Sequence, residues 1–124
     1  MVKELRESSE KNNATKDNYL IEKCKNYILT HLHGRLTLKE IAGVLCLNPS
    51  YLSDLFHRCE GITITEYIRN QKINLTRNLL IYSSYSYSEI ASYLGYASQS
   101  HLGKQFREMT GMTLKQYREA YQKK

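Results

Sequence analysis

Residues 37–63 read TLKEIAGVLCLNPSYLSDLFHRCEGIT, and residues 86–113 read SYSEIASYLGYASQSHLGKQFREMTGMT. The second stretch repeats the first, at an offset of 49 residues before its middle turn and 50 residues after it. The identical pairs include Ile41 and Ile90, Ala42 and Ala91, Leu52 and Leu102, Phe56 and Phe106, and Gly61 and Gly111. Two copies are too few for a stacked repeat array, so the pattern predicts a duplicated small module.

Each copy opens and closes with a signal for the start of a helix. In a capping box, Ser or Thr is followed three residues later by Glu or Gln, and the two side chains bind backbone N–H groups of the first turn. The chain has four such boxes: Thr37 with Glu40, Thr63 with Glu66, Ser86 with Glu89, and Thr113 with Gln116. Apolar residues elsewhere follow helical spacing, so the sequence predicts an all-α fold.

Seven helices follow from these signals. We expect four over residues 17–31, 38–45, 49–61 and 64–81, and three more that begin after Ser86, Ser98 and Thr113. Asn48 caps the third helix, and Pro49 stands at its first position, where a missing N–H costs nothing. Residues 1–16 are polar and mixed in charge, which is typical of a linker or tail. We therefore expect a tail over 1–16, a first helix-turn-helix unit with a linker helix over 17–82, and a second unit over 83–124.

Composition narrows the class of protein. The chain has 124 residues and a formal net charge of +6, and a basic domain favours polyanions, nucleic acid above all. Cys24, Cys46 and Cys59 all fall at apolar positions of helices, so we expect neither a disulfide framework nor a metal site, and a reducing cytoplasm fits. The sequence contains no signal peptide and no apolar run near ~18 residues, so nothing predicts export or membrane insertion.

The helix expected over 49–61 and the helix expected after Ser98 each have one apolar and one polar face. The apolar stripes are Leu52, Leu55, Phe56 and Cys59 in the first, and Leu102, Phe106 and Met109 in the second. The polar stripes are Ser50, Ser53, Asp54 and His57, and Ser100, Gly103, Lys104 and Arg107. Small polar and charged groups suit a helix that enters a DNA major groove. The alternative is an ordinary solvated face, but matching stripes in two duplicated units favour recognition helices.

The helix over 64–81 has a length suited to joining two such units. Eighteen residues span roughly 27 Å at 1.5 Å per residue, and successive major grooves on one face of DNA lie about 34 Å apart. Arg69, Lys72 and Arg77 make this helix basic. We expect it to face the DNA backbone, with ordinary surface charge as the alternative.

Together these residues resemble the AraC/XylS family of bacterial transcription regulators, over about residues 20–121. In the first unit the resemblance rests on Leu38, Glu40, Ile41, Ala42, Tyr51, Leu52, Ser53, Leu55, Phe56, Gly61, Ile62, Thr63, Glu66, Tyr67 and Ile68. In the second it rests on Ile81, Ile90, Ala91, Leu94, Gly95, Tyr96, Ser100, His101, Leu102, Phe106, Arg107, Gly111, Met112, Thr113, Tyr117 and Arg118. The resemblance implies two helix-turn-helix units, seven helices in all, joined by the long helix.

The resemblance also implies which residues contact DNA. The recognition helices enter two adjacent major grooves of double-stranded DNA, over about 20 bp. The base-reading positions fall on Ser50, Tyr51, Ser53 and Asp54, and on Gln99, Ser100, His101 and Lys104. Phosphate contacts are expected at Ile62, Thr63, Met112 and Thr113, because helix N-termini attract anions, and also at Lys72 and Arg107. The sequence departs from the family at Lys72, usually Arg, at Leu114, usually Pro, and at Asp54, often basic or amide.

The sequence lacks the motifs of common enzyme classes. It has no G-x-S-x-G, no phosphate-binding glycine loop and no H-E-x-x-H, so we expect no enzyme, cofactor or metal. By resemblance, we expect the C-terminal part of a longer protein, in which an N-terminal domain binds a small-molecule effector and RNA polymerase is a second partner. Two alternatives stay open: the output domain of a two-component response regulator, and a helical protein-interaction module.

Overall fold

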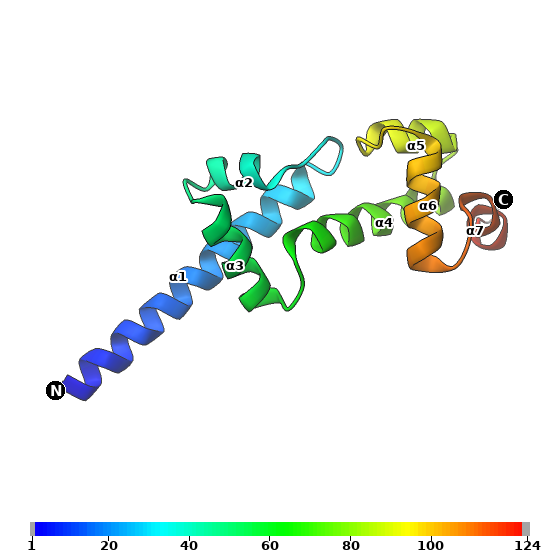
Figure 1. Ribbon diagram of the computed structural model, residues 1–124. Helices are drawn as coiled ribbons and strands as arrows, with labels where there is room; N and C mark the ends of the chain where they lie inside the picture. Colours follow the sequence, from blue (N-terminus) through cyan, green and yellow to red (C-terminus); the bar gives the residue numbers. More distant parts are fainter. Residues whose placement is uncertain (1, 123–124) are drawn as a thin grey trace. The chain divides into compact units, whose positions relative to one another are not determined.

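The computed structural model describes the backbone of residues 2–122 and the side chains of residues 15–122. Helices account for the regular structure of this part, and no strand occurs in it (Figure 1). The helices are α1 (Val2–Thr30), α2 (Leu38–Val44), α3 (Pro49–Glu60), α4 (Ile64–Tyr82), α5 (Tyr87–Tyr93), α6 (Gln99–Thr110) and α7 (Leu114–Tyr121). The all-α prediction is confirmed, and the helices from α2 onward begin where their caps predict.

The first helix begins earlier than the sequence predicts. It starts at Val2, whereas we expected a helix only from about residue 17. Residues 2–16 contain neither Pro nor Gly, so nothing in this segment stops a helix. Figure 1 shows this part of α1 continuing beyond α2 and α3. The role of residues 1–16 as a linker stays a prediction.

Contacts divide the chain into two compact units. The first comprises residues 1–30 and 37–66, and the second comprises residues 31–36 and 67–124. Most of α4 therefore belongs to the second unit, together with a six-residue segment that precedes α2 in the sequence. The boundary near residue 82 that the sequence suggests stays a prediction.

The two units have equivalent cores. In the first, α1 contributes Ile21, Cys24 and Ile28, and in the second, α4 contributes Ile73, Thr76 and Leu80 at the same i, i+3, i+7 spacing. Residues paired by the repeat are buried in both copies: Ile41 and Ile90, Ala42 and Ala91, Leu52 and Leu102, Phe56 and Phe106, and Ile64 and Leu114. Burying an aliphatic or Phe side chain contributes about 1.5–3 kcal/mol. The repeat in the sequence is thus a repeat of the hydrophobic core.

The second unit has the more complete helix caps. Ser86 with Glu89, and Thr113 with Gln116, form reciprocal capping boxes. In the first unit Thr37 accepts from the Glu40 backbone N–H at 3.1 Å, but the Glu40 carboxylate accepts from Tyr27 at 3.3 Å instead. At the fourth predicted box only the bond from the Glu66 N–H to the Thr63 hydroxyl forms, at 3.1 Å. Two of the four predicted boxes are therefore half-formed.

One cysteine lies in the core and two do not. Cys24 is fully buried, whereas Cys46 and Cys59 are exposed. The placement of Cys59 in the core stripe is wrong, because that stripe ends with Leu55 and Phe56 and the next turn of α3 faces solvent. Cys46 lies in the turn between α2 and α3. It has φ +57° and is the only non-glycine residue with positive φ in the described chain.

Candidate nucleic-acid interface

The polar stripe of α3 is accessible along its length. Ser50, Asp54 and His57 are exposed and Ser53 is half-buried, while the Tyr51 side chain beside them is 44% exposed. Asn48 caps the helix, since its side chain accepts from the Ser50 N–H at 2.8 Å. Asp54 is thus not needed as the cap and is free to present its carboxylate to solvent.

The polar stripe of α6 is equally accessible and more basic. Gln99, Ser100, His101, Lys104 and Arg107 are all exposed. The His101 ring packs edge-on against Tyr96 with centroids 5.2 Å apart, and the Tyr96 hydroxyl donates to Gln105 at 2.9 Å. Burial raises the pKa of Tyr96 to about 12, so this hydroxyl keeps its proton. The contact with Tyr96 helps to fix the position of the His101 ring in the first turn of α6.

A groove of about 780 Å³ runs along α6 within the second unit. It is open between the exposed face of α6 and the first turns of α5 and α7. Its lining residues include Tyr87, Ser100, Gly103, Lys104, Arg107 and Lys115. Lys104, Arg107 and Lys115 are cationic, and Glu108 is the one acidic lining residue. The surface therefore favours an anion. Lys115 was missed at the sequence level, because its position one residue into a capped helix carries no distinctive signal.

The backbone N–H groups expected to bind phosphate at the start of α7 already make hydrogen bonds within the chain. The Met112 N–H already donates to the Thr110 hydroxyl at 3.2 Å, and the Thr113 N–H donates to Gln116 at 2.9 Å. Neither N–H is left over for a phosphate while those bonds persist. Lys115 lies exposed in the first turn of α7 and offers a cation there. The matching residues before α4, Ile62 and Thr63, are half-buried and exposed respectively.

The Lys72 side chain is directed into the second unit and not toward solvent. It is 8% exposed, and its ammonium group donates to the carbonyl oxygen of Gly34 at 2.9 Å and to that of Leu94. Burial, and to a lesser degree the charge of Arg35, lowers the pKa of Lys72. Two carbonyl groups of the second unit therefore hold the Lys72 ammonium group, and the phosphate contact expected at Lys72 stays a prediction that this arrangement does not favour.

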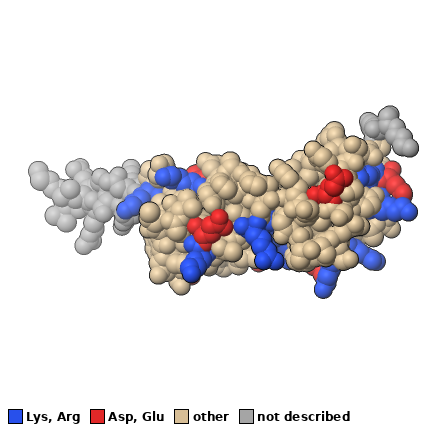
Figure 2. Space-filling view, turned by 90° about the horizontal axis from the view of Figure 1, so that it is seen from above, with Lys and Arg blue, Asp and Glu red and all other residues tan. Residues whose placement is uncertain are grey.

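The recognition helices differ in charge at equivalent positions. Lys104, Arg107 and Lys115 correspond through the 50-residue offset to Asp54, His57 and Thr65. Three cationic positions in the second unit thus match one anionic and two uncharged positions in the first, with His57 taken as neutral. Figure 2 shows one face of the molecule, where small groups of Lys and Arg lie apart on a mostly uncharged surface. At the fourth charged position of the groove, Glu108 matches Arg58, so over these four pairs the second unit's surface is still the more positive of the two.

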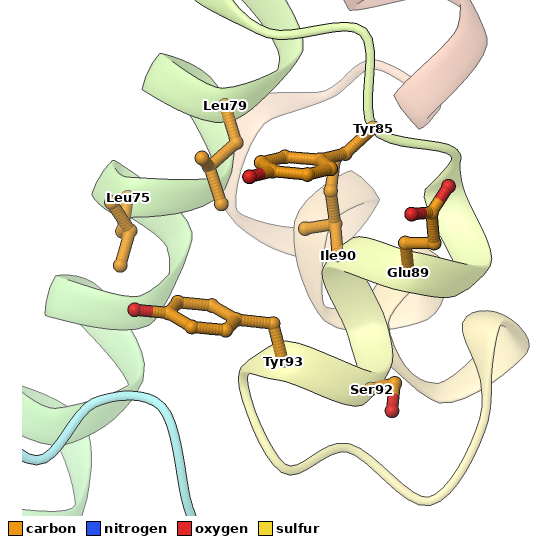
Figure 3. A pocket seen from close by; sticks show the side chains of 7 residues that line it. All are labelled: Leu75, Leu79, Tyr85, Glu89, Ile90, Ser92 and Tyr93. Carbon is orange, nitrogen blue, oxygen red and sulfur yellow. The ribbon is translucent and has the colours of Figure 1, made fainter.

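A second hollow of the same unit has a different character. It measures about 550 Å³ and lies between α4 and α5 (Figure 3). Figure 3 shows the Tyr85 and Tyr93 rings directed toward Leu75 and Leu79 of α4, with Ile90 between them. None of the residues expected to contact DNA lines it. No helix of the described chain is long and apolar enough to span a bilayer.

Comparisons with known proteins agree with this geometry. A family model described as a helix-turn-helix domain matches residues 41–120. The regulatory protein PocR of Salmonella typhimurium is 31% identical over 123 residues, which are 96% of this chain and 41% of that protein. The C-terminal domain of AraT, a response regulator from Geobacillus stearothermophilus, is 25% identical, with a TM-score of 0.82 over 85% of this chain and 88% of that one. The DNA-binding domain of AdpA, solved in complex with a target DNA, is 25% identical, with a TM-score of 0.77 over 82% and 91%.

Proposed function

Because the chain belongs to the AraC/XylS family of tandem helix-turn-helix DNA-binding domains, we propose that it binds a specific site in double-stranded DNA and regulates transcription there. The observation that carries this proposal is the cationic groove along α6. It places Lys104, Arg107 and Lys115 beside the exposed polar side chains of the same helix. Lys and Arg suit phosphates and guanine edges, and Gln suits adenine. A cytoplasmic location follows from chromosomal DNA as the target.

We assign the base contacts to the exposed faces of the two recognition helices. In α3 they are Ser50, Tyr51, Ser53 and Asp54, and in α6 they are Gln99, Ser100, His101 and Lys104. Phosphate contacts are made by Arg107 and Lys115 and by Ile62 and Thr63 before α4. At Met112 and Thr113 before α7, a phosphate contact requires that the backbone N–H groups exchange their bonds to Thr110 and Gln116 for a phosphate oxygen. The two helices enter adjacent major grooves, so one molecule covers about 20 bp. The site is asymmetric because the two faces differ in charge.

Affinity and discrimination are proposed to divide unequally between the units. Lys104→Ala should cost about 1–3 kcal/mol of binding free energy and relax specificity at one base pair. Asp54 accepts hydrogen bonds when ionised and is repelled by phosphate, so its favourable partner in DNA is a cytosine amino group. Asp54→Ala should therefore leave non-specific affinity unchanged or higher, with discrimination lost at that cytosine.

The test combines selection from a random DNA pool with titrations of the selected site at several salt concentrations. Affinity should fall steeply as salt rises, because bound phosphates release counterions. Footprints should show two contact clusters about 10 bp apart. An affinity that does not change with salt would refute the proposal of DNA binding and favour a protein-interaction module. A short palindromic site that is bound only by a dimer would refute the proposal that one molecule binds two adjacent major grooves.

The setting of this domain within its whole protein is also a proposal. The chain spans 41% of PocR, which leaves room in such relatives for further domains. We propose a regulator in which another domain senses a small-molecule effector and RNA polymerase is the second partner. A two-component output domain is the alternative, favoured by the likeness to the C-terminal domain of the response regulator AraT. The gene's full reading frame would separate the two, since a phosphoacceptor domain and an effector-binding domain differ in sequence.

A further inference from the structure

Residues 31–36 follow α1 in the sequence, yet they belong to the second unit. The Lys72 ammonium donates to the Gly34 carbonyl oxygen at 2.9 Å, and it also donates to that of Leu94, just before the turn into α6. The His33 ring lies 6.2 Å from the ring of Tyr93. A Cβ atom on Gly95 would lie 2.8 Å from the carbonyl carbon of Gly34. The backbone of this segment is therefore packed directly on the helix-turn-helix turn.

This packing brings Arg35 to a polar groove at the start of α6. The groove measures about 410 Å³, and among its walls are Ser88 and Ser92 of α5 and Ser98 and Gln99 at the start of α6. Arg35 is the one charged residue in its lining. The side chain is exposed, and no carboxylate in the described chain forms an ion pair with it. The groove thus offers a guanidinium and several hydroxyl groups, with no anion of the protein to satisfy the charge.

Two further basic side chains lie near this groove, and no carboxylate in the described chain forms an ion pair with either of them. Lys72 lies 5.5 Å from the centre of the Tyr96 ring, which lines the groove, and Arg35 adds to the lowering of its pKa. Arg69 acts electrostatically on the Tyr96 hydroxyl, and its Nε is buried without an acceptor. The charges of Arg35 and Lys72 repel one another. A bound anion would offset that repulsion, which makes the region complementary to a phosphate.

The groove meets the cationic groove of α6 at a shared residue. Gln99 lines both, so the two hollows adjoin the first turn of the recognition helix. The major groove is about 12 Å wide, with phosphates along both of its rims. A helix inserted there needs cations beside it in more than one direction. Lys104, Arg107 and Lys115 supply them in one groove, and Arg35 supplies the cation of the other.

We propose that Arg35 binds a backbone phosphate of the DNA site read by α6, so that the segment before α2 completes the second unit's binding surface. The inference rests on DNA binding as the proposed function. It adds a phosphate contact that lies outside both copies of the sequence repeat. Lys72 and Gly95 act as positioning residues, because they hold the segment that carries Arg35.

The first test measures the number of phosphates neutralised. Arg35→Gln is compared with Lys23→Gln, an exposed lysine of α1 whose contact is with the Tyr19 ring. Each phosphate contact contributes about 0.9 to the slope of log affinity against log salt. Between 50 and 200 mM salt, wild type should therefore lose roughly three- to fourfold more affinity than Arg35→Gln. Lys23→Gln should match wild type. If Arg35→Gln keeps the wild-type slope, the proposal is wrong, whereas a flat slope in wild type would instead refute DNA binding itself.

The second test locates the contact. Phosphates of the selected site are replaced one at a time by neutral methylphosphonates. At one position near the bases read by α6, the substitution should weaken wild type and leave Arg35→Gln unaffected. Equal losses for both proteins at every position would overturn the proposal and assign Arg35 a diffuse electrostatic effect. Urea unfolding of Arg35→Gln should match wild type, since the side chain is exposed and no ion pair forms with it.

Discussion

Gly95→Ala is the substitution whose cost the structure defines most sharply. The residue has φ +76°, and in this left-handed region an L side chain costs about 1–2 kcal/mol. The new Cβ would also lie 2.8 Å from the Gly34 carbonyl carbon and 3.0 Å from the Arg35 nitrogen, and both of these are backbone atoms. Forcing extra volume into a packed site costs about 1–3 kcal/mol more. We expect a total loss of about 2–5 kcal/mol in the free energy of unfolding, or displacement of residues 31–36.

A matched control separates the two contributions. Gly111 has φ +77°, but a Cβ there would meet nothing within 4 Å. Gly111→Ala should therefore lose only the backbone contribution, about 1–2 kcal/mol. Urea unfolding of the whole chain, followed by circular dichroism, compares the two variants directly. If Gly95→Ala costs no more than Gly111→Ala, the close packing of residues 34–35 on the turn is refuted.

Three further predictions concern single residues. Cys46→Gly should stabilise the chain by about 0.5 kcal/mol in urea unfolding, because glycine removes the cost of a positive φ but orders a more flexible chain. Lys72→Met should destabilise it by about 2–3 kcal/mol, since hydrogen bonds from a charged donor are lost, whereas Arg77→Met should cost under about 0.5 kcal/mol. Hydrogen bonds from Ser86 lower the pKa of Glu89 below its usual 4.5. The stability advantage of wild type over Glu89→Gln should thus be full near neutral pH and disappear as acid protonates Glu89; an advantage that persists at pH 2 would contradict this.

The fold could be predicted because its determinants are local. A Ser or Thr cap binds N–H groups two or three residues away, so the first residue of each helix from α2 onward can be located from the sequence. The beginning of α1 carries no cap or breaker, and its start was placed too late. Cys59 was misplaced for a related reason: helical spacing predicts a face, but it does not say where the partner that covers the face ends.

The candidate site was predictable only in part. The polar stripes of α3 and α6 lie where their periodicity predicts, since a helix with one buried face must expose the other. The fate of Lys72 depends on carbonyl groups 38 and 22 residues away in the sequence. Arg35 reaches its groove through the same long-range packing. Contacts of this kind do not follow helical periodicity, so the sequence contains no signal for the position of either side chain.

The placement of residues 31–36 bears on how such domains recombine. Because this segment belongs to the second unit, the polypeptide passes between the units after residues 30, 36 and 66. A gene fragment that encodes only residues 67–124 would contain Lys72 but not the Gly34 carbonyl that accepts its hydrogen bond. It would also contain Gly95 but not the backbone of residues 34–35 that packs against it. Chimeras that exchange the second unit between regulators should therefore exchange the segment before α2 along with it. The second copy of the sequence repeat and the compact second unit are therefore not the same piece of chain.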